Sequence, residues 1–454
     1  MVGRVAGALA AASLPYWLPD AVVAARMRIF RLVNGDEGIA IPGPEVGAEH
    51  FAEVYGHPAA NGRSRGAALS DLFWYWLSPG ADIHQEHLEP GPRYEAVAAV
   101  TRRMVARPRT AIEALATDCT ARVLDERAIA GARLVRLRDL MMPVWAEFAY
   151  ELVFGERCPR HARDLIVGNA NDVVTALKCT GLRHMARRTR LTRFLVERLE
   201  RGPEPTRPLP DGLTAEQRAL YLQGTFFNTA VVQMSEAMAH LLMVLAQHPE
   251  AQQRVGDEQY LDRVIDETFR LYPLFGIAHR IASADIEVDG RTLPEGSVLC
   301  FNYPAYHRAG YDDPEEFSPE RWERLSHRDA AFIPFGMPGN RPCPARGLAP
   351  VAMRAATHEV LRRLTLATSA SHTRSIPNRG PCVLVPRGAR APRTLLAFMR
   401  IRDRWEDVSR SLVQLVLGTY MVWDARRQRL CERHFADERL DESAIRPPPG
   451  PLVN

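Results

Sequence analysis

Seven cysteines are scattered along this chain of 454 residues, and Cys343 has the most informative neighbours. The stretch FIPFGMPGNRPCPARG at 332–347 surrounds it with glycine and proline, and a helical pattern follows. A cysteine at a helix N-terminus lies near amide groups that have no partner within the helix. These amides stabilise a thiolate, so we expect a depressed pKa for Cys343. No CxxC pair accompanies it, which argues against a zinc cluster or a disulfide framework.

The residues before Cys343 suit a flat ligand that carries both a metal and carboxylates. Gly336 and Gly339 let the backbone approach such a ligand closely. Phe335 can pack beside the ligand, and Arg341 offers a guanidinium to a carboxylate. A macrocycle with an iron and two propionates fits all of these features.

Two further patterns precede the cysteine in a fixed order. Glu267 and Arg270 are three residues apart in a helical stretch, so they share a face and can pair. The segment FSPERW at 317–322 follows, inside a stretch rich in Pro, Gly, Asp and aromatic residues. Each pattern alone is weak, because a Glu–Arg pair of this spacing is usually a solvated ion pair.

Taken in this order, the three patterns resemble the cytochrome P-450 family, and the resemblance covers residues 214–388. The resemblance implies haem b with the Cys343 thiolate as axial ligand of the iron. It implies a structural triad of Glu267, Arg270 and Arg321, and a contact between Arg280 and a haem propionate. It also implies the cytochrome P-450 fold, which is mainly α with a smaller β portion. The family's cysteine loop, Phe-Gly-x-Gly-x-Arg-x-Cys, matches Phe335, Gly336, Gly339, Arg341 and Cys343.

The sequence departs from the family pattern in the loop and in the central helix. The loop has one extra residue, in Met337-Pro338, and Ala345 replaces the usual glycine after the cysteine. The acid–alcohol pair of the central helix, which relays protons to dioxygen in ordinary family members, falls on Val232 and Gln233. Valine cannot carry a proton, and glutamine can hydrogen-bond but does not titrate. Asn228 and Thr229 are the nearby polar candidates if the alignment slips by one turn.

This departure leaves two kinds of chemistry open. In the first, water, substrate or another residue replaces the acid–alcohol pair, and the protein is a monooxygenase fed by a ferredoxin and its reductase. In the second, the chemistry needs no activation of dioxygen: rearrangement, dehydration, peroxide use or nitrene transfer. A non-catalytic homologue that assists another enzyme is a third hypothesis, which the presence of Cys343 disfavours.

Hydrophobic periodicity predicts the elements that must position these residues. A helix of mostly apolar residues should run from 215 to 247 across the middle of the protein, capped by Thr214. We predict further helices over 258–272, from 345 to 366 and from about 391 onward, strands at 277–284, 297–301 and 383–385, and a long loop over 303–342. We predict two parts: a haem domain over 1–388 and a helical extension of unknown role over 389–454.

The resemblance also indicates four segments that line the distal pocket, and their composition predicts a lipophilic small-molecule substrate. The FWYW stretch at 73–76 can equally belong to the core, and His279 can equally make a core hydrogen bond. The predicted pocket residues are Phe73, Trp74, Trp76, Phe226, Phe227, Val231, Gln233, Phe275, Ile277, His279 and Ile376.

Composition excludes several other classes of function. The net charge of +4 is small for this length, which argues against a nucleic-acid partner. The apolar N-terminal stretch from 2 to 25 is interrupted by Pro15, Pro19 and Asp20, so we expect no transmembrane anchor. We therefore expect a cytoplasmic enzyme, with a role in bacterial secondary metabolism as the most fitting context.

Overall fold

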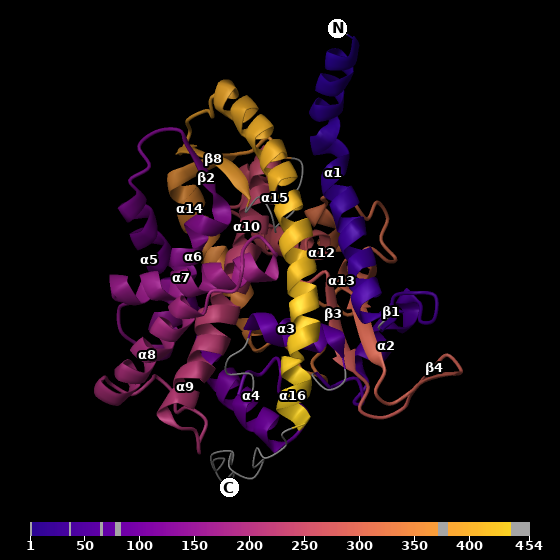
Figure 1. The fold of residues 1–454 in the computed structure, drawn as a ribbon. Helices are drawn as coiled ribbons and strands as arrows, with labels where there is room; N and C mark the ends of the chain where they lie inside the picture. The colour runs from indigo at the N-terminus through magenta and orange to yellow at the C-terminus, as the bar shows by residue number, and fades with distance from the viewer. Residues whose placement is uncertain (1, 36–37, 64–66, 78–82, 371–379, 437–454) are drawn as a thin grey trace.

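The computed structural model describes residues 2–35, 38–63, 67–77, 83–370 and 380–436 (Figure 1). Most of these residues are helical, so the prediction of a mainly α fold with a smaller β portion is confirmed. The helices are α1 (Val2–Asn34), η1 (Ala48–His50), α2 (Phe51–Gly56), α3 (Ala68–Leu77), α4 (Pro92–Val105), α5 (Arg109–Arg127), α6 (Leu137–Phe154), α7 (Arg160–Leu177), α8 (Met185–Arg201), α9 (Ala215–Leu222), η2 (Gln223–Ala230), α10 (Val231–Gln247), α11 (Pro249–Arg254), α12 (Glu258–Leu271), α13 (Tyr303–Tyr306), η3 (Pro319–Glu323), η4 (Pro344–Gly347), α14 (Ala349–Arg363), α15 (Arg393–Gln428) and α16 (Leu430–Ala436).

The strands of the described residues form three small sheets. In the first, β6 (Val298–Asn302) pairs in parallel with β1 (Ile39–Ile41) and antiparallel with β3 (Ile277–Ile281). In the second, β8 (Pro381–Pro386) pairs antiparallel with both β2 (Arg133–Arg136) and β7 (Leu364–Ala367). The third is the hairpin of β4 (Ile286–Val288) and β5 (Arg291–Leu293). The strands predicted near 277, 297 and 383 are all present.

The predicted central helix is present, as a continuous run through α9, η2 and α10. Thr214 caps it: its hydroxyl accepts from the Gln217 N–H, while the Gln217 side chain accepts from the Thr214 N–H. The middle segment, η2, is a π-helix. In the described chain, this is the one helix long and apolar enough to cross a membrane, but 83% of its apolar window is buried in the fold. It is therefore the core helix of the protein.

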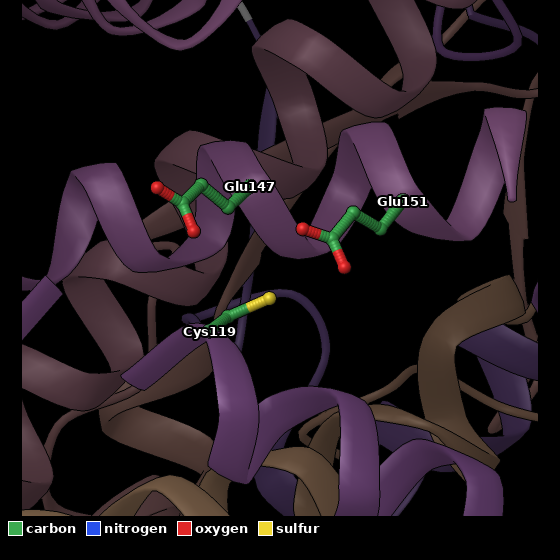
Figure 2. A group of neighbouring side chains, drawn as sticks. All are labelled: Cys119, Glu147 and Glu151. Atoms are coloured by element: carbon green, nitrogen blue, oxygen red, sulfur yellow. The ribbon is translucent and has the colours of Figure 1, made fainter. Parts of the chain in front are cut away.

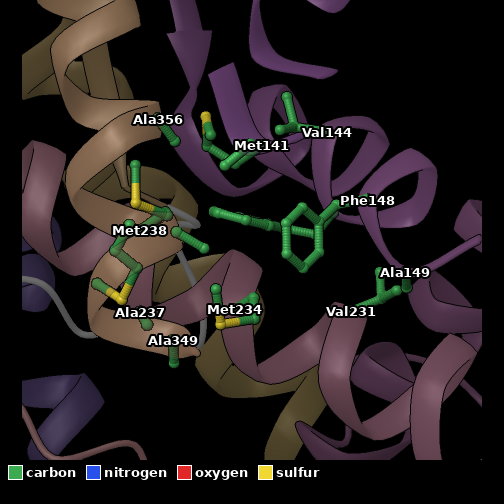
Figure 3. Packing of buried hydrophobic residues seen from close by; sticks show 14 of the residues in the cluster. Met141, Val144, Phe148, Ala149, Val231, Met234, Ala237, Met238, Ala349 and Ala356 are labelled. Atoms are coloured by element: carbon green, nitrogen blue, oxygen red, sulfur yellow. The ribbon is translucent and has the colours of Figure 1, made fainter. Parts of the chain in front are cut away.

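The main hydrophobic core forms around α10. Figure 3 shows side chains of α10 packed between α6 and α14. Methionine, valine and alanine dominate the contact, so the three helices approach closely, and one buried ion pair, between Arg138 of α6 and Glu236 of α10 at 2.7 Å, crosses it. The labelled contacts come from Met141, Val144, Phe148 and Ala149 of α6, Val231, Met234, Ala237 and Met238 of α10, and Ala349 and Ala356 of α14.

A buried ionic network fixes α5 against α6. Cys119, Glu147 and Glu151 converge from the two helices with their ligand-type atoms within 4.8 Å of one another (Figure 2). Arg122 donates to all three: to the Cys119 sulfur at 3.2 Å, to Glu147 at 3.0 Å, and to Glu151. Arg163 also donates to Glu147, at 2.7 Å. Because two guanidiniums already neutralise the carboxylates, this cluster is a structural ion-pair network and not a metal site.

The helix predicted over 345–366 is wrong at both ends. A 3-10 turn, η4, follows Cys343, and α14 begins only at Ala349. At the other end the chain leaves the helix after Arg363 and continues directly as β7. Tertiary pairing with β8 overrides the helical pattern in this last turn.

The C-terminal part of the chain packs along the N-terminal helix. In Figure 1, α15 and α1 lie side by side, and both run in the same direction along the molecule. Gly418 of α15 allows the contact, since a Cβ there would lie 3.0 Å from the Arg26 Nε of α1. Arg26 then donates to the Cys179 sulfur at 3.3 Å. Residues 437–454 of the predicted extension lie outside the described residues.

His240 of α10 gives the fold a specific sensitivity to acid. Burial lowers the pKa of His240 from 6.5 to about 4. Below pH 6.5 the unfolded chain binds a proton that the folded chain refuses, so stability falls as the pH drops from 6.5 towards 4. We expect this residue to contribute a slope of about 1.4 kcal/mol per pH unit in that window.

The measurement is urea unfolding of the wild type and of His240→Phe across this pH range, with the variant showing the shallower slope. The half-buried His50→Gln serves as control. A hydrogen bond to Glu53 raises the pKa of His50, so its removal should not make the slope of stability against pH shallower. Equal slopes in the wild type and His240→Phe would contradict the prediction.

Candidate functional site

The loop before Cys343 is held in a compact turn. The Cys343 N–H donates to the Phe335 carbonyl at 2.9 Å, which brings the two ends of the loop together. Gly336 has φ of +66°, and a Cβ there would lie 2.9 Å from the Tyr55 hydroxyl. The space beside Gly339 is open. The extra residue in Met337-Pro338 is absorbed by a single bridge between Met337 and Asn340, so the insertion leaves the loop closed.

The thiol of Cys343 is not activated by the helix that follows. Burial raises its pKa to about 11, and the N–H of Ala345 only partly opposes this. The prediction of a depressed pKa is therefore wrong for the protein alone. The prediction fails because η4, and not the first turn of α14, follows the cysteine, so the free N–H groups of a helix N-terminus do not offset the desolvation of the thiol. A thiolate at this position requires an electropositive partner at neutral pH.

Glu267 lies at the centre of a buried ionic cluster next to this loop. It is fully buried and accepts from Arg270 at 2.8 and 2.9 Å, and from Arg321 at 3.0 Å. The Trp322 indole N–H and the Ser318 backbone N–H also donate to it, at 3.0 and 3.1 Å. The structure thus brings together Glu267, Arg270 and Arg321, although 51 positions separate the last two.

Two further arginines lie at the cysteine loop, one on a neighbouring strand and one within the loop itself. Arg280 of β3 donates to the Asn340 carbonyl at 3.2 Å and stacks on the ring of Tyr55 at 3.9 Å. Arg341, within the loop, donates to the Leu88 carbonyl at 2.6 Å. Burial lowers the pKa of Arg341 to about 10, so it remains charged at neutral pH.

A carboxylate, Glu86, lies among these positive groups. It forms an ion pair with Arg63 at 2.7 Å. Desolvation acts to raise its pKa, but the charge of Arg63, with those of Arg341 and Arg280, outweighs desolvation and the pKa is lowered. Three guanidiniums therefore gather beside the cysteine loop, which makes this region favourable for anions.

The central helix presents one partly open face in an otherwise buried run. Thr225, Thr229, Ala230 and Gln233 keep part of their surface accessible. The first, second and fourth of these are spaced four residues apart, so they share one face. The Oγ1 atom of Thr225 is buried and has no hydrogen-bond partner among the described residues. The open face therefore offers hydroxyl and amide groups and no carboxylate.

Other side chains of the same helix segment, which were predicted to line the pocket, are buried in the core. Phe226 and Phe227 are buried against the rings of Tyr221 and Phe154. Val231 is also fully buried, and Val232 is 8% exposed. That Phe226, Phe227 and Val231 line a pocket stays a prediction, because in this structure all three side chains pack into the core.

The sequence did not indicate that His84 lies at the accessible face of the central helix. Its ring lies against Gly224, where a Cβ would come within 2.4 Å of it, and its Nε2 is 3.3 Å from the Thr229 hydroxyl. Burial lowers the pKa of His84, so the ring is neutral at pH 7. The segment 83–89 thus contacts the open face of the helix through His84 and the cysteine loop through Leu88.

The remaining residues that were predicted to line the pocket lie in different environments. His279 hydrogen-bonds to Ser70 at 2.9 Å and stacks at 5.3 Å on Phe73, which is half-buried. Phe275 and Ile277 are exposed, at 43% and 47%. Trp74 is a core residue that packs against Cys431. The side chain of Trp76 and the whole of Ile376 lie outside the described residues.

Comparison with known proteins decides the family. Residues 211–391, which carry the triad and the cysteine loop, match the family model described as cytochrome P-450. These residues form a cytochrome P-450 domain. A solved zebra fish cytochrome P-450 with progesterone is 18% identical, covers 80% of this chain and 99% of its own, and superposes with a TM-score of 0.64. The cytochrome P-450 fold is therefore confirmed.

The curated proteins that are similar in sequence match a shorter part of this chain than the solved structure does. Cytochrome P-450 3A13 of Mus musculus is 32% identical over 156 residues, which are 29% of this chain and 31% of the relative. Cyclooctat-9-en-7-ol 5-monooxygenase of Streptomyces melanosporofaciens is 31% identical over 164 residues, which are 31% of this chain and 34% of the relative. The chain spans about a third of the length of these curated relatives.

The site fits the cofactor of the cytochrome P-450 family, a haem with a cysteine thiolate as axial ligand. Cys343 is half-buried and needs an electropositive partner to ionise, which an iron ion supplies. The guanidiniums of Arg280 and Arg341 can turn from main-chain carbonyls towards propionates, with Arg63 beside them. Gly339 leaves its side of the loop open to a flat ligand.

Proposed function

We propose that this cytochrome P-450 is a haem-thiolate enzyme that oxidises a lipophilic small molecule, with Cys343 as the axial ligand. The observation that carries the proposal is the loop that closes on Cys343 at 2.9 Å beside three guanidiniums. When bound, haem supplies redox chemistry at its iron, to which the thiolate donates electron density. The chain holds the ligand loop, binds the propionates with Arg280 and Arg341, and orients substrate at the open face of the central helix.

Apolar side chains around α3 and β3, which include predicted pocket residues, support the choice of substrate. Phe73 is half-buried beside His279, and Phe275 and Ile277 keep accessible apolar surface on the same strand region. An aromatic and aliphatic lining favours a hydrophobic ligand with few polar groups. The Streptomyces relative is named as a monooxygenase of cyclooctat-9-en-7-ol, which supports oxidative tailoring in bacterial secondary metabolism. A ferredoxin and its reductase are the electron donors that we propose for a cytoplasmic enzyme of this kind.

A second candidate function follows from the composition of the central helix. Val232 is buried and Gln233 is half-buried. Because these residues are a valine and a glutamine, no carboxylate lies at the position where the family places its acid. Chemistry that requires no proton delivery to dioxygen is compatible with this arrangement: rearrangement, dehydration, peroxide-driven oxidation or nitrene transfer. It would act on a substrate that brings its own oxidised N–O or O–O bond.

One assay distinguishes the two functions. Candidate lipophilic metabolites are incubated with the haem-loaded protein, in air and without oxygen, each with and without ferredoxin and reductase. We expect product only in air with the full electron-transfer chain. Product formed without oxygen and reductase would overturn the monooxygenase proposal in favour of the second function. The absence of bound haem in a correctly folded preparation would overturn both.

The contact between Thr229 and His84 provides a specific prediction for the monooxygenase. A hydroxyl hydrogen-bonded to a neutral imidazole can hold and pass a proton at the open face of the helix. Replacement Thr229→Val removes this hydroxyl at nearly constant volume, and we expect turnover to fall about a hundredfold.

The matched control is Thr225→Val, one helical turn away on the same face, whose hydroxyl has no partner among the described side chains. We expect turnover of this control to stay within about twofold of the wild type. If Thr229→Val also kept turnover within about twofold of the wild type, water or substrate would be the group that delivers the proton.

A further inference from the structure

The long helix α15 exposes far more large apolar side chains than an ordinary surface helix. Its exposed side carries eight large apolar residues, and Val416 and Trp423 are 68% and 53% exposed. At 100° per residue these eight positions fall within an arc of roughly 120°. From first to last they span about 38 Å of helix. The residues are Phe398, Ile401, Trp405, Leu412, Val413, Val416, Tyr420 and Trp423.

The side of α15 that faces the protein is instead rich in polar groups. Asp403 is buried and accepts from Arg136 at 2.7 Å, and Gln414 donates to the Lys178 carbonyl at 2.8 Å. Ser411 and Asp424 are buried on the same helix. The fold thus uses specific polar contacts to hold the helix with its apolar stripe outward. A contiguous apolar stripe of this size on a protein surface indicates an interaction site.

The charges that flank the stripe all have one sign. Every exposed charged residue within α15 is an arginine: Arg393, Arg400, Arg404, Arg426 and Arg427. The four acidic residues of the helix are buried or half-buried, and three of them pair with arginines. The exposed face of α15 therefore combines apolar and aromatic side chains with positive charge and carries no exposed carboxylate, and Asp20 is the one acidic residue of the neighbouring α1.

The neighbouring helix α1 extends this face. Tyr16, Trp17, Val23 and Met27 are exposed large residues of α1. The faces join where the Arg404 guanidinium lies 4.7 Å above the Tyr16 ring. Because the two helices lie side by side (Figure 1), they form one broad surface, which we name the α1–α15 surface.

We propose that the α1–α15 surface binds an anionic lipid bilayer, with both helices lying in the plane of the headgroups. Apolar and aromatic residues that enter the interface, flanked by arginines that reach phosphate groups, are the pattern of helices that lie on membranes. Charge complementarity selects anionic lipid over neutral lipid. A second copy of the chain fits less well, because symmetric pairing would bring five exposed arginines of each α15 against those of the other.

A flotation assay with the full-length, haem-loaded protein tests the proposal. One set of vesicles contains phosphatidylcholine alone, and the other contains equal parts of phosphatidylcholine and phosphatidylglycerol. We expect at least about tenfold more protein to float with the anionic vesicles, and less at high salt. Replacement of Val416→Ser together with Trp423→Ser should lower the bound fraction about tenfold.

The control variant carries Leu325→Ser, which removes an exposed leucine that follows η3 and belongs to neither helix of this surface. Its flotation should match that of the wild type, and circular dichroism and the haem spectrum should show all variants folded. Wild-type protein that stays in the lipid-free fraction overturns the proposal. So does equal flotation on neutral vesicles, and so does a dimer in lipid-free sedimentation that the Val416→Ser, Trp423→Ser variant abolishes.

Discussion

Replacement of Cys343 by serine is expected to abolish the thiolate-type spectrum of the haem-loaded protein. The hydroxyl of serine keeps the size of the side chain and the hydrogen bond from the Ala345 N–H, but it does not donate electron density as a thiolate does. We expect turnover to fall by at least about a thousandfold, or ~4 kcal/mol of transition-state stabilisation. The measurements are the carbon monoxide difference spectrum and the rate of product formation.

Cys300→Ser is the matched control for this experiment. Cys300 is also half-buried, and it lies in β6 of the first sheet, outside the loop. This variant should keep the thiolate-type spectrum and an activity close to that of the wild type. A thiolate-type spectrum in Cys343→Ser would contradict the assignment of the ligand and direct attention to another cysteine.

Periodicity in the sequence was enough to predict the central helix and the helix that carries Glu267 and Arg270. The apolar run from 215 to 247 and its Thr214 cap predicted the central helix, because burial on nearly all sides leaves a strong hydrophobic signal. The link between Glu267 and Arg321 was predicted by family resemblance and not by periodicity. Local spacing cannot show that residues 54 positions apart meet.

The pKa of Cys343 could not be predicted from its neighbours in sequence. The pattern suggested a helix directly after the cysteine, whereas Pro344 opens a short 3-10 turn and α14 starts later. Desolvation by residues far away in the chain then dominates and raises the pKa. The burial of Phe226 and Phe227 could not be predicted either, since tertiary neighbours decide which side chains of a central helix stay accessible.

His84 and the α1–α15 surface were also beyond the reach of the sequence. A histidine in an irregular segment carries no periodic signal, and its contact with Thr229 depends on Gly224 admitting the ring. An apolar stripe on a helix normally faces the core, so the sequence does not indicate that the stripe of α15 is exposed. That it faces outward follows from the polar contacts of Asp403 and Gln414 with the body.

Replacement Glu267→Gln is expected to lower the free energy of unfolding by about 3–5 kcal/mol. The glutamine keeps the shape of the side chain but removes the charge that Arg270 and Arg321 share in a fully buried position. It also brings an amide group towards donors, because five N–H groups now point at the two carboxylate oxygens. Two buried guanidiniums without a full counter-charge account for most of the cost.

The control for this variant lies on the surface of the same loop region. Glu320 pairs with Arg254 at 2.8 Å, and both side chains are about half exposed. Water screens that pair, so Glu320→Gln should change the free energy of unfolding by less than about 1 kcal/mol. Urea unfolding followed by circular dichroism at pH 7 measures both, and haem content reports the state of the loop. A loss in Glu267→Gln no larger than in Glu320→Gln would show that packing, and not the buried ion cluster, holds the cysteine loop to α12.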